Sequence, residues 1–156
     1  MRSPPAKGFT LIELTVVLVI AGLLFAVSVP NFSKWSESRD YREAIRQIVS
    51  AANSARAQAS RSNQAVDLIF ELEQKTMSVV AAGGSLEKNK VFRLPESLTV
   101  SVTSAAALSS SKDASVIRFY PAGGASGGDI EVVRDSGTGT LIQIGWLLAD
   151  VRQTAI

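Results

Sequence analysis

The sequence predicts an α+β protein in which one long N-terminal helix precedes a domain rich in strands. An apolar run without a charged residue extends from Leu14 to Ser33 and passes into a segment with helical periodicity. Beyond residue 62 the chain changes to short, β-branched segments bounded by Gly, Pro, Ser or Asp, which is typical of strands. One helix followed only by strands favours a helix laid across antiparallel sheet.

The apolar run is long enough to cross a membrane as a helix. Twenty residues at about 1.5 Å each span roughly 30 Å, the thickness of a bilayer's hydrocarbon core. A single carboxylate, Glu13, stands at the start of the run. Burying an ionised carboxylate in lipid costs at least about 2.5 kcal/mol, so we expect this residue to be functional and to have a cationic partner. An amine freed by cleavage between Gly8 and Phe9 would lie at the same membrane depth.

The segment from Lys7 to Leu14, KGFTLIEL, resembles the type III signal of type IV pilins and type II secretion pseudopilins. That signal is a short basic leader ending in Gly, then Phe-Thr-Leu-Ile-Glu and an apolar helix. The resemblance implies a pilin-like fold. It also implies that a prepilin peptidase cuts after Gly8 and N-methylates Phe9, and that Glu13 acts in assembly by facing the Phe9 amine of a neighbouring subunit.

Two other interpretations of the N-terminus compete with this one. An ordinary secretory signal peptide would be cut near residues 26–28, but the Glu near the start of the apolar run and the length of the run argue against it. A plain signal anchor fits the positive leader held in the cytoplasm. That anchor leaves Gly8 and Glu13 unexplained.

The predicted organisation has three parts: a leader at 1–8, a transmembrane helix at 9–30, and a periplasmic domain at 31–156. Pro30 lacks an N–H and its ring clashes one turn back, so we expect a kink or a local break there. Gly22 is a second weak point. As one helix, Phe9 to Ser62 would measure about 80 Å.

Charge and composition exclude several functions. The chain has 16 Lys and Arg against 14 Asp and Glu, and the two excess cations, Arg2 and Lys7, both lie in the leader. The basic pI is therefore no argument for nucleic-acid binding, and we do not expect a nucleic-acid partner. There is no His and no Cys, which excludes Ser-His-Asp and Cys-His catalysis. The absence of Cys also leans toward a pseudopilin, because many type IV pilins close a C-terminal loop with a disulfide.

The second half of the helix is amphipathic. Its apolar residues recur at three- and four-residue steps and form one stripe, which comprises Tyr41, Ala44, Ile45, Ile48, Ala52, Ala55 and Ala59. The opposite face is basic, and we interpret it as a solvated surface. Arg39–Glu43 and Glu43–Arg46 have the spacing of helical ion pairs.

Seven strands are predicted after the helix. They are 65–70, 76–81, 91–94, 98–103, 116–120, 130–134 and 141–146. The Ala- and Ser-rich segment 104–115 is expected to be a long exposed loop.

The glycine-rich segment 121–128 is interpreted as a connection between two strands. A phosphate-binding loop would need Lys-Ser or Lys-Thr after the glycines and then a helix, whereas Asp-Ile-Glu-Val-Val follows here. The stretch from Phe119 to Ile130 also resembles the C-terminal half of GspH/FimT-type minor pilins. The Gly-Arg-Val expected near the end reads Ala-Asp-Val-Arg at 149–152, which leaves the subfamily open.

No metal or cofactor site is predicted. Asp129, Glu131 and Asp135 lie around an expected hairpin, but calcium needs six to eight oxygens from a spaced loop, so we interpret them as exposed turn carboxylates. Trp35 and Trp146, together with Tyr41, are interpreted as interface or core aromatics, with Trp35 at the membrane surface. No pair of carboxylates has a spacing that indicates acid–base catalysis.

The sequence is therefore identified as a member of the pilin-like family, of GspH/FimT type, and not as an enzyme. The expected role is a minor pseudopilin at or near the tip of a type II secretion pseudopilus, anchored in the bacterial inner membrane with its C-terminal domain in the periplasm. Expected partners are the prepilin peptidase, major and minor pseudopilins, the inner-membrane assembly platform and lipid. Two alternatives are a FimT/FimU-like minor type IV pilin for pilus priming or DNA uptake, and a membrane-anchored periplasmic binding module that never polymerises.

Overall fold

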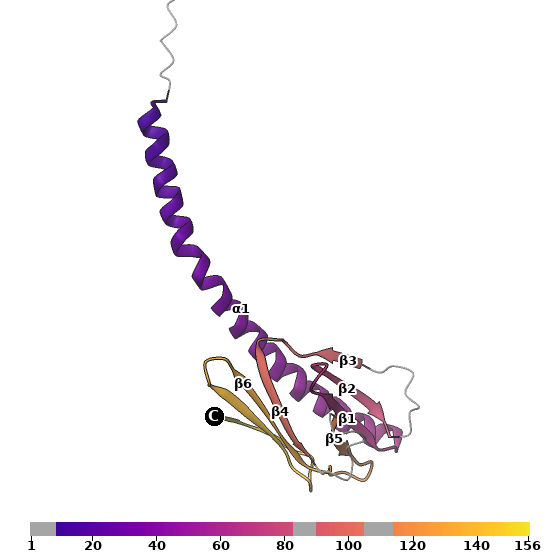
Figure 1. The fold of residues 1–156 in the computed structure, drawn as a ribbon. Coiled ribbons are helices and arrows are strands. Elements are labelled where there is room, and N and C mark those ends of the chain that lie inside the picture. The colour runs from indigo at the N-terminus through magenta and orange to yellow at the C-terminus, as the bar shows by residue number, and fades with distance from the viewer. Residues whose placement is uncertain (1–8, 83–89, 105–113) are drawn as a thin grey trace, which may run out of the picture. The chain divides into compact units, whose positions relative to one another are not determined.

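The computed structural model describes residues 9–82, 90–104 and 114–156; the side chains of residues 26–36 and of Lys90 are not described. The chain divides into two compact units, Met1–Ser38 and Arg39–Ile156. One helix, α1 (Leu11–Ser62), begins in the first unit and ends in the second. Figure 1 labels α1 and the strands β1 to β6.

Helix α1 runs through Pro30 without interruption, so of the two outcomes that we expected there, a kink or a local break, the break is wrong. A proline removes one backbone hydrogen bond and usually bends a helix instead of ending it, because the bonds on either side remain. The helix ends where Asn63 adopts a left-handed φ of 53°, a conformation that often follows the last helical turn.

Eight strands follow the helix, in two antiparallel sheets. Sheet A has the order β3-β2-β1-β5, and sheet B the order β4-β6-β7-β8. The strands of sheet A are β1 (Val66–Glu71), β2 (Thr76–Ala81), β3 (Lys90–Arg93) and β5 (Ala114–Phe119). The strands of sheet B are β4 (Leu98–Ser104), β6 (Gly128–Arg134), β7 (Gly139–Ile144) and β8 (Val151–Ala155).

The seven predicted strands are confirmed, with ends that differ by at most two residues, and β8 was missed. Ser104, Ala114 and Ser115, which were assigned to a loop, extend β4 and β5. The rest of that expected loop, 105–113, lies outside the described residues.

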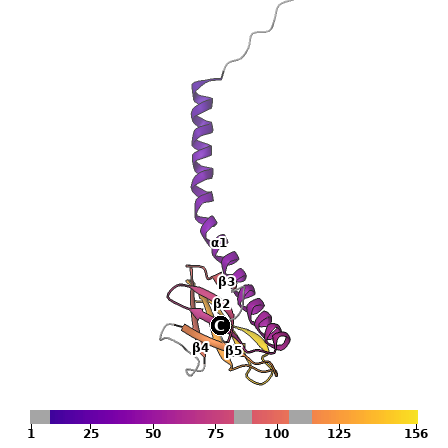
Figure 2. The same ribbon diagram turned by 90° about the vertical axis from the view of Figure 1, so that its right-hand side faces the viewer.

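One hydrophobic core joins the two sheets and the second half of α1. The predicted apolar stripe is confirmed, because Ala44, Ile48, Ala52, Ala55 and Ala59 are buried and Tyr41 and Ile45 pack against them. The small alanine side chains let the helix approach the strands closely. Figures 1 and 2 show this part of α1 beside the strands in two views. The sheets contribute large core residues such as Phe70, Phe119 and Ile142.

The helix is also fastened to sheet B by polar contacts. The Tyr41 hydroxyl lies 2.6 Å from the Thr140 hydroxyl of β7. The Arg134 guanidinium lies over the Tyr41 ring at 4.5 Å from its centroid, a distance suited to a cation–π contact. Tyr41 is therefore a core aromatic, as the sequence indicated.

Candidate functional site

The start of α1 carries a helix cap that the sequence interpretation missed. The Glu13 N–H donates to the Thr10 hydroxyl (3.3 Å) and to the Thr10 carbonyl (3.1 Å). Thr at the cap with Glu three residues later is the residue pattern of a capping box, of which the bond to the Thr10 hydroxyl is formed. Glu13 also lies in the first turn, where the helix dipole favours a negative charge. Glu13 therefore has a local role in addition to the predicted assembly role.

In the first half of α1, the described side chains, those of residues 11–25, are exposed on nearly all sides of the helix. Exposed large apolar residues occur at nearly every position, among them Phe9 (85% exposed), Leu11, Ile12, Leu14, Val16, Val17, Leu18, Val19, Ile20, Leu23, Leu24 and Phe25. A helix that is apolar all round requires an apolar environment or other helices around it. This segment therefore needs a partner that the described part of the chain does not provide.

Within the described residues, no helix is both long and apolar enough to be recognised as a membrane span.

The described residues provide no partner for the Glu13 carboxylate, whose side chain is exposed among these apolar neighbours. An unpaired carboxylate in an apolar surface becomes costly once that surface is covered, unless a cation arrives with the cover. Phe9 is described and exposed. Gly8, the other predicted cleavage residue, lies outside the described residues, so the structure does not place the predicted cleavage site.

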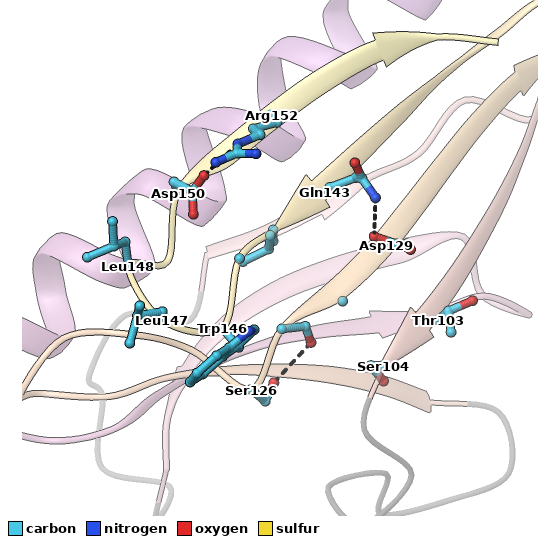
Figure 3. A pocket seen from close by; sticks show the side chains of 14 residues that line it. Thr103, Ser104, Ser126, Asp129, Gln143, Trp146, Leu147, Leu148, Asp150 and Arg152 are labelled. Carbon is cyan, nitrogen blue, oxygen red and sulfur yellow. Dashed lines mark hydrogen bonds and ion pairs between the residues drawn. The ribbon is translucent and has the colours of Figure 1, made fainter.

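A second candidate surface is a groove at one end of sheet B, shown in Figure 3. It has a volume of about 730 Å³. The turn between β7 and β8 forms its apolar wall, because Trp146 (71% exposed), Leu147 and Leu148 project from it. Ser126, Asp129, Gln143, Asp150 and Arg152 are among its polar lining residues. Trp146 is therefore a surface aromatic, and the Trp35 side chain lies outside the described ones.

The glycine-rich segment supports this groove and is a connection between β5 and β6, as predicted. The Ala125 N–H donates to the Trp146 carbonyl at 2.9 Å. Gly124 has a φ of +78°, and a Cβ there would lie 2.7 Å from the same carbonyl oxygen. A side chain at Gly124 would therefore push the two loops apart. The glycines hold the Trp146 turn in place, which is a structural role.

The carboxylates near the groove are held by neighbouring side chains. Asp129 accepts a hydrogen bond from Gln143 (3.2 Å) and Glu131 accepts one from Ser101 (3.2 Å). Both residues lie within β6 and only Asp135 lies in the following turn. No group of three or more metal-binding side chains occurs in the described part of the chain.

On the solvent face of α1, the predicted ion pair Glu43–Arg46 forms at 2.6 Å. Glu43 also accepts a hydrogen bond from Gln47 at 2.9 Å. The hydrogen bond from Gln47, assisted by the hydrogen bond and charge of Arg46, lowers the pKa of Glu43 despite a smaller opposing effect of desolvation.

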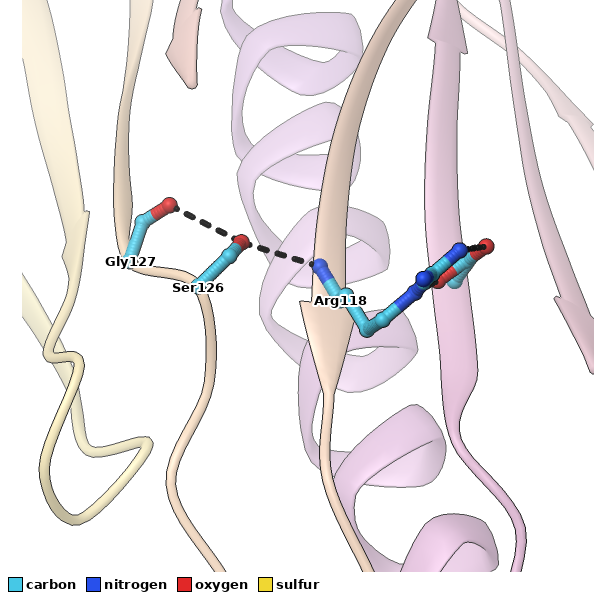
Figure 4. A network of polar contacts seen from close by, with 4 residues as sticks. Arg118, Ser126 and Gly127 are labelled. Atoms are coloured by element: carbon cyan, nitrogen blue, oxygen red, sulfur yellow. Dashed lines mark hydrogen bonds and ion pairs between the residues drawn. The ribbon is translucent and has the colours of Figure 1, made fainter. Parts of the chain in front are cut away.

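A partly buried ion pair in sheet A was not predicted. Arg118 of β5 donates to Asp67 of β1 through two nitrogens, at 2.6 and 2.7 Å. Hydrogen bonding to Asp67 raises the pKa of Arg118, against the effect of desolvation. The Ser126 hydroxyl accepts from the Arg118 backbone N–H and donates to the Gly127 carbonyl, so it links sheet A to the glycine-rich segment (Figure 4). These contacts stabilise the fold and offer no reactive group.

Two family profiles match this chain. The profile described as Type II transport protein GspH matches residues 44–147, two thirds of the chain. The profile described as prokaryotic N-terminal methylation motif matches residues 4–29.

Curated relatives match shorter stretches. The Type IV major pilin protein PilA of Myxococcus xanthus is 33% identical over 100 residues, which cover 60% of this chain and 46% of PilA. The Type II secretion system core protein G of Aeromonas hydrophila is 40% identical over 53 residues, which cover 34% and 37%. The chain spans less than half of the length of the curated relatives it matches.

Among solved structures, the type IV minor pilin FimU of Pseudomonas aeruginosa has a similar fold. The TM-score is 0.55 at 16% sequence identity, over 77% of this chain and 92% of FimU. At this identity the likeness concerns the fold alone. It confirms the predicted α+β class with an N-terminal helix.

Proposed function

Because this chain belongs to the GspH family of type II transport proteins, we propose that it is a minor pseudopilin of a type II secretion system. In this role it is a structural subunit, not an enzyme, and it enters the periplasmic pseudopilus at or near the tip. The observation that carries the proposal is the combination in one chain of the methylation motif at 4–29 and the GspH domain at 44–147.

Processing follows from the N-terminal motif. A prepilin peptidase cleaves between Gly8 and Phe9 and methylates the new Phe9 amine. The leader 1–8 is thereby removed, and the mature subunit begins with an apolar residue followed by the helix. The high exposure of Phe9 supports this proposal, because a peptidase must reach the bond that precedes it.

Assembly uses the apolar surface of Phe9–Phe25 and the charge of Glu13. In the inner membrane, lipid covers this surface, the C-terminal domain lies in the periplasm, and the assembly platform receives the subunit. In the filament, the helices of major and minor pseudopilins replace the lipid. The Glu13 carboxylate then faces the Phe9 amine of a neighbour, and in a low dielectric the opposite charges offset each other's burial and fix the axial register.

A minor subunit of a type IV pilus is the second candidate. The similarity to the M. xanthus major pilin extends over 100 residues and therefore well beyond the shared N-terminal motif. The chemistry proposed for Gly8, Phe9 and Glu13 is the same in both filaments. The two candidates differ in the subunits that surround the chain.

One experiment distinguishes the two candidates. The tagged chain is crosslinked in cells and then captured from solubilised inner membrane. Partners and the N-terminus of the tagged chain are identified by mass spectrometry. We expect secretion pseudopilins together with a chain that begins at methylated Phe9. Pilus subunits would establish the second candidate. An intact leader without any pilin-like partner would refute both and favour a membrane-anchored binding module.

A further inference from the structure

The outer face of sheet B carries a row of polar side chains that crosses all four strands. Thr103 of β4 pairs with Asp129 of β6. Asp129 also pairs with Gln143 of β7, which pairs in turn with Arg152 of β8. Directly paired residues of an antiparallel sheet point to the same face, and neighbouring strands lie about 4.8 Å apart. These four side chains therefore form one line across the sheet, which we call the polar row.

The polar row faces solvent. Ile130 and Ile142, which adjoin row residues in β6 and β7, are fully buried in the core. Because successive residues of a strand point to opposite faces, their neighbours Asp129 and Gln143 point outward. Three of the four row residues are exposed and Asp129 is half-buried. The row is therefore accessible and forms the floor of the groove beside Trp146.

The charges of the groove are nearly balanced within it. Its described lining contains one cation, Arg152, which pairs with Asp150 at 2.8 Å. The remaining charged lining residue, Asp129, accepts a hydrogen bond from the neutral amide of Gln143 at 3.2 Å. One negative charge is therefore left without a cation in this lining. Phosphate groups and nucleic acids are unsuitable ligands, because like charges repel.

One wall of the groove is apolar. Figure 3 shows Trp146 on one side of the groove and Thr103 and Ser104 on the other. Trp146 is 71% exposed, and its turn is fixed by the hydrogen bond from the Ala125 N–H to the Trp146 carbonyl. An exposed indole ring offers a rigid, flat apolar face. The matching ligand has an apolar face for Trp146 and hydrogen-bonding groups for the polar row.

Recognition at the floor depends on side chains, because the backbone there is already used. Strands β6 and β7 are each paired on both sides within sheet B. The Gly145 N–H, directly after β7, donates to the Asp150 carbonyl at 2.9 Å. An extended peptide that binds to a sheet is held through open backbone groups, which this floor lacks. A sugar chain binds instead through side-chain hydroxyl, amide and carboxylate groups, and the polar row contains all three.

We propose that this groove binds a neutral oligosaccharide chain. A sugar ring has an apolar face of C–H groups and a rim of hydroxyl groups, so one ring stacks on Trp146 while the hydroxyls of the following rings bond to the polar row. The strand spacing of about 4.8 Å is close to the length of one sugar ring in such a chain. The volume of about 730 Å³ lies within the range of ligand sites and accommodates several rings. This site does not rest on the proposed filament function.

The test uses saturation-transfer NMR of sugars added to the full chain in micelles. The detergent has no sugar headgroup, so that it does not compete for the groove. The probes are N-acetylated chitotetraose, cellotetraose and maltotetraose, which are neutral chains of different sugar and linkage. We expect at least one of them to bind, with the strongest transfer to its C–H protons. Binding of the acetylated probe alone would assign the ligand to amino-sugar glycans, such as that of the bacterial cell wall, and binding of a glucose chain to plain polysaccharides.

Variants of the apolar wall test the stacking contact. Trp146→Ala should weaken binding about tenfold or more, because an aromatic contact and its buried area are lost. Trp146→Tyr should restore most of the affinity, since it keeps a flat ring. Val91→Ala is the matched control, because Val91 of β3 is 60% exposed and does not line the groove. Circular dichroism should show the same unfolding for all three variants, as expected at exposed positions.

A variant of the polar row tests the charge argument. The sugar that binds best is compared with the same sugar after oxidation of its primary alcohols to carboxylates. The oxidised form should bind a few-fold more weakly, the size of effect that exposed charges have, because Asp129 repels it. Asp129→Asn, which keeps the shape of the side chain, should remove most of this difference.

Several results would each overturn the proposal. They are the absence of binding by all three sugars, unchanged binding in Trp146→Ala, and an oxidised sugar that binds as well as its neutral form. Tighter binding of an uncharged peptide of serine and leucine at Trp146 would also overturn it, because the groove would then be a protein-docking surface. A failed filament role would instead appear as an intact leader and would leave these readouts unchanged.

Discussion

The two halves of α1 place the same apolar residue types in opposite environments. Ile20 in the first half is 52% exposed, whereas Ile48 in the second half is fully buried. The apolar stripe of the second half is covered by the protein's own sheets. In the first half, the described large apolar side chains from Leu11 to Phe25 are exposed. The comparison teaches that one continuous helix contains a part that stabilises the fold and a part that only another molecule can cover.

Among the variants, we expect the largest effect for Gly8→Val. This variant tests whether cleavage releases the first half of α1 from the leader. We expect no cleavage, because a branched side chain at the residue before the cut blocks the peptidase. Immunoblotting and mass spectrometry of the N-terminus measure the extent of cleavage. Ala6→Val, the same bulk within the leader, should be processed normally. A chain of mature size from Gly8→Val would refute the assigned site.

Substitutions of Glu13 separate its two roles. Glu13→Ala should reduce incorporation into filaments about tenfold or more while membrane insertion and cleavage continue, since loss of one partner leaves a buried amine unpaired. Glu13→Gln retains a side chain suited to the capping box but lacks the charge. Quantification of sheared filaments should show both variants equally impaired. Rescue by Gln would mean that capping, and not charge pairing, is the function of Glu13.

Ile→Ala at two positions of α1 tests the comparison directly. Ile48→Ala should lower the free energy of unfolding of the domain by about 2–5 kcal/mol, because it leaves a cavity in the core. Ile20→Ala should change it by less than about 0.5 kcal/mol, as an exposed site does. Denaturant unfolding of the detergent-solubilised chain, followed by circular dichroism, measures both. Equal losses would contradict the division of α1 into two parts.

The smallest effect concerns how the stability of the domain depends on pH. Because the folded pKa of Glu43 is lowered from 4.5, its ionised form stabilises the fold above that pH, and the contribution is lost as the pH falls through the folded pKa. Glu43→Gln should therefore flatten the fall in melting temperature below about pH 4.5. Gln47→Leu, which removes the largest cause of the shift, should flatten it in the same direction. Unchanged acid profiles in both variants would contradict this assignment.

The sequence alone was sufficient to predict those elements whose pattern of apolar residues is strong. The alanine stripe from Ala44 to Ala59 has helical period and no competing signal, and the alternation in Leu98–Thr103 is that of a half-buried strand. Strand β8 was not predicted because its sequence, Val-Arg-Gln-Thr-Ala, lacks the alternation of apolar and polar residues. Its residues are exposed, and it forms because its backbone pairs with the edge of β7.

The candidate sites were predictable only in part. The segment KGFTLIEL indicates its chemistry because the residues that take part in it are neighbours in the sequence. By contrast, the Asp67–Arg118 pair joins residues 51 positions apart, and only the register of β1 with β5 brings them together. The groove is also assembled from separate segments, since the Ala125 N–H holds the Trp146 turn and the missing side chain of Gly124 permits this close approach.

The most direct test of the account is photocrosslinking in living cells from the first half of α1. A photoreactive residue in place of Val17, which is 59% exposed, is compared with one in place of Asn53 on the solvent face of the second half. We predict adducts with pilin-like subunits from Val17 that disappear in Gly8→Val, and none of these adducts from Asn53. The same set of adducts from both positions, or only lipid adducts from Val17 in the processed chain, would contradict the claim that other subunits cover this helix.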